Sequence, residues 1–214
     1  MIFTLQSKQD KQLEQFYNEV MEELGQFFGF NWTKNRPKVF LVPDRKTIDT
    51  LREEKTPDWL VGGGGAREGY VFVLSPENFE TESNHRYSDE EWRALLKHEL
   101  VHCFYHVVTG FISRPRWLCE GVATCLSGQN EWIKPVTKFK DFLDDYATAS
   151  KSAYREGGFV VEILLKQFGK EKLIELLEKI KQEKPDEKGF SKLFESVYGI
   201  KLSYQELNKL KETS

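Results

Sequence analysis

The amino-acid sequence predicts an α+β fold, with short strands in the first part of the chain and helices in the rest. Two short apolar runs, 39–42 and 70–74, are each followed within two residues by a proline, which is typical of strands that end at a turn. After residue 88, apolar residues recur at helical spacing instead. A group of strands followed by a group of helices indicates an α+β arrangement.

The first part of the chain, residues 1–87, is expected to form a strand-containing lobe. Residues 8–28 place apolar side chains three and four positions apart, which predicts an amphipathic helix. The first strand comes next, and a second helix is expected over residues 45–54. Four consecutive glycines, Gly62–Gly65, then lead to the second strand, 70–74.

The remaining residues, 88–214, are expected to form a mostly helical lobe. Ser88 and Glu91 make a capping box, in which two side chains satisfy the first backbone N–H groups of a helix. This helix should run to about Thr109, where Gly110 ends it. Further helices are predicted over 116–127, 151–168, 170–183 and 190–198, and after Ser203. We expect the whole chain, 1–214, to be one domain, with the Ser88 helix between its lobes.

The composition argues against several classes of protein. Hydrophobic residues make up 39% and charged residues 30% of the 214 residues, an ordinary balance for a globular protein. The net charge of −3 argues against a nucleic-acid binder, which usually carries a basic excess. No window approaches about 18 apolar residues, so no membrane-spanning segment is expected. Three cysteines without a Cys-x-x-Cys pair, and an N-terminus without a signal-peptide pattern, favour a cytoplasmic location.

The strongest chemical signal is the run His98-Glu99-Leu100-Val101-His102 within the capped helix. Four residues advance a helix by about 400°, so the two imidazoles project from one face and can reach one tetrahedral zinc ion. Glu99 lies beside them, where its carboxylate can take a proton from water. The same pattern also arises by accident on helices that bind no metal. The apolar surroundings argue against that alternative, because two buried histidines usually need partners.

A catalytic zinc ion needs a third protein ligand and an open position. His106 shares the helix face, but three ligands over two turns of one helix would be strained, so we expect His106 to line the site or the core. Glu120 is the better candidate, because a glutamate on an apolar helix is costly to bury without a metal or another partner. One zinc ion per chain is therefore expected, with His98, His102 and Glu120 as its ligands.

These segments resemble the gluzincin group of metallopeptidases, which are peptidase MA-like proteins. HELVH is followed by Trp-Leu-Cys-Glu-Gly-Val-Ala at 117–123, similar to the helix that supplies the third zinc ligand in that group. Residues 154–157, Tyr-Arg-Glu-Gly, resemble the Tyr-x-x-Gly segment of the aminopeptidase-like gluzincins. The resemblance covers about residues 92–169. It implies a zincin-like fold, Glu99 as the general base, and Tyr154 as a hydrogen-bond donor to the oxyanion, in a small relative of the large aminopeptidases.

A fourth segment, Gly65-Ala66-Arg67-Glu68-Gly69, resembles the Gly-Ala-Met-Glu-Asn segment of the same aminopeptidases but departs from it at two positions. In those enzymes the segment lies along the substrate, and its Glu binds the free amino terminus. The resemblance makes Gly65, Ala66 and Glu68 candidate substrate-binding residues. On turn chemistry alone, the stretch is a glycine-rich turn before an edge strand. In either case it can bind an extended peptide by β-augmentation.

The expected function is zinc-dependent hydrolysis of a peptide or protein substrate, with Glu99 as the general base. The four glycines and the two departures favour endopeptidase over aminopeptidase action. Two alternatives stay open: a catalytically inactive zincin-fold protein that binds peptides, and a zinc hydrolase of a non-peptide amide. Intact Glu99 and Tyr154 argue against the first, because a structural zinc site needs neither. The sequence does not predict the oligomeric state.

Overall fold

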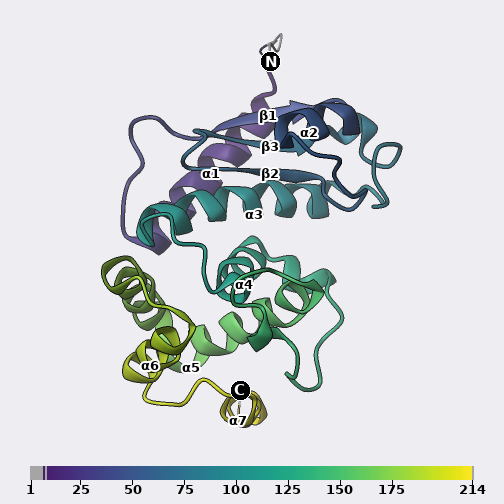
Figure 1. The fold of residues 1–214 in the computed structure, drawn as a ribbon. Coiled ribbons are helices and arrows are strands. Elements are labelled where there is room, and N and C mark those ends of the chain that lie inside the picture. The colour runs from purple at the N-terminus through teal and green to yellow at the C-terminus, as the bar shows by residue number, and fades with distance from the viewer. Residues whose placement is uncertain (1–6, 8, 214) are drawn as a thin grey trace.

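The computed structural model describes residue 7 and residues 9–213, and it has the predicted α+β architecture (Figure 1). Its helices and strands are α1 Lys11–Phe28, β1 Lys38–Val42, α2 Arg45–Arg52, β2 Gly62–Gly65, β3 Tyr70–Leu74, α3 Asp89–Val108, α4 Arg116–Ser127, α5 Lys151–Glu183, α6 Glu187–Tyr198 and α7 Tyr204–Glu212. Three short 3-10 turns lie between them at Pro76–Asn78, Gln129–Trp132 and Phe142–Asp144. None of these helices is long and apolar enough to cross a membrane.

The sheet has three strands in the order β1-β3-β2. β1 runs parallel to β3, with Lys38 opposite Tyr70, and β2 runs antiparallel to β3, with Gly62 opposite Val73. β2 is therefore an edge strand, and no other strand of the described residues pairs with its second edge. The sequence did not predict this strand, because glycine has a low strand propensity. Pairing with the buried strand β3 imposes the extended conformation on the glycines.

α3 runs beneath β2, with the sheet on one side and the helices α4 to α7 on the other (Figure 1). α1 packs against α3, and the ring of Phe28 stacks on that of Phe104 with 5.6 Å between centroids. The Asp10 side chain accepts a hydrogen bond of 3.0 Å from the Leu13 N–H, so α1 begins at Lys11. Position 8 of the predicted range lies outside the described residues.

The predicted helices after residue 88 are all present, with shifts that follow from capping. α6 begins before residue 190, because Asp186 caps it by accepting a 2.8 Å hydrogen bond from the Gly189 N–H. Ser203 caps α7 in the same way, as predicted. α5 covers both predicted helices, 151–168 and 170–183. Gly169, with φ 80° and ψ 166°, interrupts its helical geometry, so the predicted break at this glycine is confirmed.

One hydrophobic cluster joins the sheet to the helices. It includes buried side chains from α1, β3, α3, α4 and α5, for example Leu24, Val73, Phe104, Leu118 and Leu177. Because α3 contributes to this cluster along its length, it is fixed from both sides. The histidines of the sequence motif are therefore carried by a rigid element.

Candidate metal centre

The two histidines of the motif lie on the same face of α3. Ser88 caps the helix by accepting a hydrogen bond from the Glu91 N–H, as the capping box predicts. His98 is buried and His102 is nearly so, and their Nε2 atoms are 3.0 Å apart. This separation of two side chains one helical turn apart is the one that the sequence spacing predicts.

α4 brings Glu120 to these two imidazoles. Its side chain is buried, and its Oε2 atom lies 3.5 Å from His98 Nε2 and 3.3 Å from His102 Nε2. Two atoms bound to one tetrahedral zinc ion at about 2.0–2.2 Å are roughly 3.3–3.5 Å apart. The three separations therefore match, within a few tenths of an ångström, the edges of such a site. The His98, His102 and Glu120 group has the donor atoms and the spacing that a metal ion needs.

The second carboxylate oxygen of Glu120 is already engaged. Arg116, one turn earlier on α4, donates a hydrogen bond from its guanidinium to Glu120 Oε1. Only Oε2 is therefore left facing the imidazoles, so each of the three side chains offers one atom to a cation. Arg116 also balances part of the negative charge that burial of Glu120 brings into the protein.

The charges within this group are strongly coupled. Burial raises the pKa of the Glu120 carboxyl, but His102 and His98 outweigh it and hold this pKa well below its ordinary range. Burial lowers the pKa of His102, but Glu120 and Cys119 outweigh it and raise this pKa well above the ordinary value. The imidazole of His102 and the carboxylate of Glu120 thus favour each other's charged forms. A divalent cation and protons would compete for these ligand atoms.

Cys119 makes a contact that the sequence did not predict. Its Sγ atom lies 3.5 Å from Nδ1 of His102 and is fully buried, as expected for a small core residue. A partner on Nδ1 fixes the orientation of the ring and leaves Nε2 for the metal side. Thr124, an alternative partner for a histidine, makes no such hydrogen bond: its Oγ1 and His98 Nδ1 are both buried without a partner among the described residues.

Glu99 lies under the edge strand β2. A Cβ atom added to Gly62 would come within 2.9 Å of Glu99 Oε1, so a larger residue here would displace this carboxylate. Burial raises the pKa of Glu99 above its ordinary value, although the neighbouring histidines oppose the shift. A buried carboxylate with a raised pKa, beside a candidate metal-binding group, is suited to accept and release a proton.

β2 follows α3 in the same direction. Gly62 lies over Glu99, and three residues later a Cβ atom on Gly65 would be 3.4 Å from His106 Nδ1. Three strand residues and seven helix residues both span about 10 Å, so the two elements run side by side over this length. The backbone of β2 therefore passes along the face of α3 that carries the histidines.

A close crossing of α4 and α5 brings Tyr154 to the site. A Cβ atom on Gly121 would lie 2.6 Å from the Gly157 carbonyl oxygen, and one on Gly157 would lie 2.7 Å from the Trp117 carbonyl oxygen. The two glycines thus let the helix backbones touch next to Glu120. Tyr154 is one turn before Gly157 and is half-buried, and burial together with the charge of Glu120 raises the pKa of its phenol. It remains a hydrogen-bond donor at neutral pH.

Comparison with known protein families gives one match. Residues 50–206 match the family BSP, described as peptidase of plants and bacteria. The chain belongs to this peptidase family. No curated protein and no solved structure matches it. The matched range contains α3, α4 and all of α5, so it includes the whole candidate metal centre.

In this BSP-family peptidase, the segment from Gly65 to Gly69 is the turn of a hairpin. The Gly69 N–H donates a 3.1 Å hydrogen bond to the Gly65 carbonyl, and Ala66 and Glu68 lie in the turn between them. The expectation of a turn before an edge strand is wrong in one respect. The strand that follows, β3, is central, and the edge strand is the glycine run before the turn. Glu68 is exposed, and its carboxylate lies beside Gly65 rather than Gly62.

His106 does not belong to the candidate metal-binding group of this peptidase, as expected. Its Nε2 atom is 3.1 Å from Ser113 Oγ. Burial and the positive charge of His102 lower the pKa of His106 to about 4, so its ring stays neutral at physiological pH. It therefore lines the end of β2 without adding a charge there.

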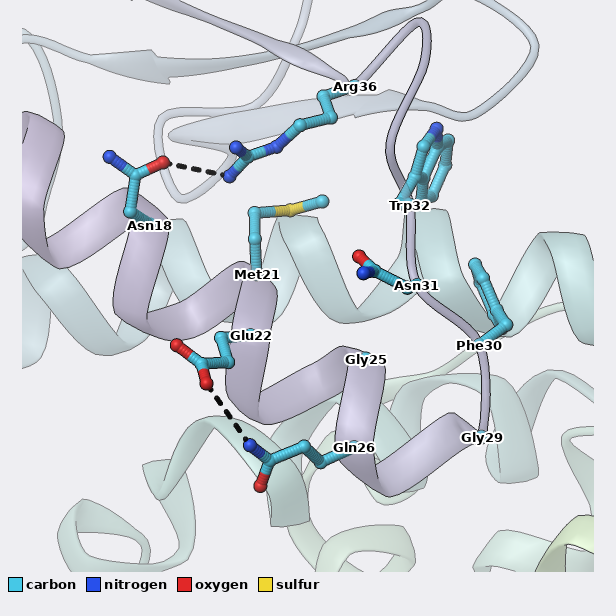
Figure 2. A pocket seen from close by; sticks show the side chains of 10 residues that line it. All are labelled: Asn18, Met21, Glu22, Gly25, Gln26, Gly29, Phe30, Asn31, Trp32 and Arg36. Atoms are coloured by element: carbon cyan, nitrogen blue, oxygen red, sulfur yellow. Dashed lines mark hydrogen bonds between the residues drawn. The ribbon is translucent and has the colours of Figure 1, made fainter.

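A hollow of about 690 Å³ lies elsewhere on the peptidase, between α1 and residues 29–36 (Figure 2). Arg36 reaches back toward α1 and donates a 3.0 Å hydrogen bond to Asn18 across it. All of its lining residues belong to these two segments, and none is a member of the candidate metal-binding group. The hollow is therefore separate from the candidate metal centre.

Proposed function

We propose that this chain is a zinc-dependent peptidase of the gluzincin type, in which His98, His102 and Glu120 hold one zinc ion per chain. The observation that carries the proposal is the spacing of the three ligand atoms, 3.0 to 3.5 Å, which matches a tetrahedral zinc site. Membership of a peptidase family supplies the substrate class, a peptide or a protein.

Zinc, when bound, supplies a Lewis acid that polarises the scissile carbonyl and activates a water molecule. Glu99 accepts the proton of the attacking water and returns it to the leaving amine, and its raised pKa suits both transfers. The Tyr154 hydroxyl donates a hydrogen bond to the carbonyl oxygen as negative charge develops there. Arg116 holds Glu120 so that one carboxylate oxygen faces the two imidazoles.

The purified protein is expected to contain about one zinc ion per chain, measured by mass spectrometry. His98→Ala, His102→Ala and Glu120→Ala should each lose the metal, because each removes one of three protein ligands. His106→Ala is the matched control, since it removes a histidine from the same helix outside the metal-binding group. It should keep its zinc. Stoichiometric zinc in Glu120→Ala, or loss of zinc in His106→Ala, would show that the ligands are assigned wrongly.

We further propose that cleavage is internal, as in an endopeptidase. An aminopeptidase must bind the free amine one residue before the scissile bond. Here Glu68 lies beside Gly65, whereas Glu99 lies beside Gly62. Three strand residues separate these two points by about 10 Å, which is too far for a carboxylate that fixes the amino-terminal residue at the cut. The separation supports internal cleavage.

The mode of cleavage can be decided with one peptide sequence prepared with and without an N-terminal acetyl group. The wild-type protein should cut both forms at the same internal bonds and at rates within about threefold, because no charge of the peptide end is needed near the cut. Mass spectrometry of the products gives the positions. Stepwise release of single residues from the free peptide alone would establish aminopeptidase action instead.

A further inference from the structure

The loop between α2 and β2 presents one large apolar side chain to solvent. Trp59 is 52% exposed and lies three residues before Gly62. A single exposed aromatic residue is common on protein surfaces and by itself indicates nothing. What distinguishes Trp59 is how firmly its backbone is held and which residue its ring contacts.

The backbone around Trp59 is held by hydrogen bonds from two side chains, Arg45 and His85. The Arg45 guanidinium donates hydrogen bonds to the carbonyls of the two residues before Trp59 and of the residue after it. It also bonds the carbonyl of Glu82, which ties the loop to the rest of the fold. His85 Nε2 lies 3.0 Å from the carbonyl of Trp59 itself. An exposed indole on such a loop is pre-organised, so a ligand that contacts it orders little additional backbone.

The indole of Trp59 also contacts the proposed site. Its ring lies edge to face against the ring of Tyr154, with 6.5 Å between centroids and 61° between planes. Tyr154 comes from α5 and Trp59 from the α2–β2 loop, so the pair joins the two sides of the site. About half of Trp59 remains exposed to solvent beside the tyrosine that we assign to the oxyanion.

We propose that Trp59 binds an apolar side chain of the substrate on the C-terminal side of the cleaved bond. This inference rests on the proposed peptidase function. Within residues 9–213 no strand pairs with the second edge of β2, so this edge can accept an extended peptide, and antiparallel pairing is the more stable arrangement. Gly62 lies over Glu99 and so marks the cleaved bond, and Trp59 precedes Gly62. In an antiparallel pair, the substrate residues opposite this end of β2 are those that follow the cut.

Digestion of a peptide library tests the inference. The wild-type protein should prefer a large apolar residue, such as Leu or Phe, within the first two positions after the cut. Trp59→Ala should lower kcat/KM for these peptides about tenfold, mainly through KM, and should flatten the preference. Trp59→Phe should restore most of it. Trp132→Ala is the matched control, because Trp132 is 44% exposed and lies outside the α2–β2 loop; its profile should equal that of the wild type.

A preference that is unchanged in Trp59→Ala, or that changes only before the cut, overturns the inference. A binding measurement separates this failure from failure of the proposed function. Acetylated peptides with Phe or with Ser at one position are titrated calorimetrically into the zinc-loaded Glu99→Gln protein, with and without Trp59→Ala. The Trp59→Ala change should weaken binding of the Phe peptide about tenfold and leave the Ser peptide unaffected. If the wild-type protein cleaves no peptide, the proposed function fails. If the Phe peptide binds with equal affinity with and without Trp59→Ala, the Trp59 contact is overturned, whatever the outcome of the cleavage assay.

Discussion

Glu99→Gln is expected to lower kcat by roughly 10²–10⁴-fold while the zinc content stays at the wild-type level. Glutamine has the volume of glutamate but cannot accept a proton from water. The ligand atoms of His98, His102 and Glu120 are not altered by this change. The check is a peptide-cleavage assay together with metal analysis of the same sample. Near wild-type kcat in zinc-loaded Glu99→Gln would remove Glu99 as the general base.

The same substitution should stabilise the metal-free protein at neutral pH. Burial raises the folded-state pKa of Glu99. A carboxyl with a raised folded-state pKa destabilises the fold above its unfolded pKa, and the cost grows until the pH passes the raised value. Glu99→Gln removes this cost. Its free energy of unfolding in the presence of a chelator should therefore exceed that of the wild type at neutral pH, and the gap should close as the pH falls.

Urea denaturation at several pH values measures this gap. The exposed Glu195→Gln on α6 is the control, since it removes the same charge from a solvated position and should leave the stability almost unchanged. A wild-type protein that is more stable than Glu99→Gln at neutral pH would mean that this carboxylate is compensated in the fold. Its pKa would then not be raised.

Gly157→Ala is expected to destabilise the protein by about 3 kcal/mol and to lower its zinc content. The added methyl group would meet the Trp117 carbonyl oxygen at 2.7 Å, where backbone and not a movable side chain blocks it. α4 and α5 would have to separate next to Glu120, which would shift the carboxylate from the imidazoles and Tyr154 from the site. Urea denaturation and metal analysis measure the two effects.

Gly158→Ala is the matched control for this substitution. Its methyl group would meet the side-chain oxygen of Asn130 and the Cγ2 of Thr124, and no backbone atom is among these contacts, so the loss of stability should be smaller. Equal losses in the two variants would show that the backbone contact between Gly121 and Gly157 does not set the crossing of the helices.

The parts of the fold and site that the sequence predicted depend on local spacing. The helix from Ser88 follows from its cap and its apolar period, and the pairing of His98 with His102 follows from the pitch of that helix. Glu120 followed from the cost of burying an unpartnered carboxylate. Each of these inferences uses residues within one helix, so the long-range packing did not have to be known.

The features that the sequence did not predict all join distant segments. β2 is a strand because β3 pairs with it, although four glycines carry no strand propensity of their own. The contact of Cys119 with His102 and the contact of Trp59 with Tyr154 depend on how helices and loops pack. The glycines of Glu120-Gly121 and of Tyr154–Gly157 were recognised from the sequence only through the resemblance to gluzincins. Their physical reason, a helix crossing that admits no Cβ atom, is visible only in three dimensions.

An edge strand made only of glycine has a consequence for what the enzyme can attack. β2 offers N–H and C=O groups but no side chains, so along its length it recognises an extended backbone and not a residue type. The backbone groups of a folded target are already paired within its own helices and sheets. If the substrate pairs with β2, as proposed, only locally unfolded segments have backbone groups free to do so. Pairing with this strand would therefore select unstructured segments over structured ones. Tails, linkers and damaged proteins would be the accessible targets.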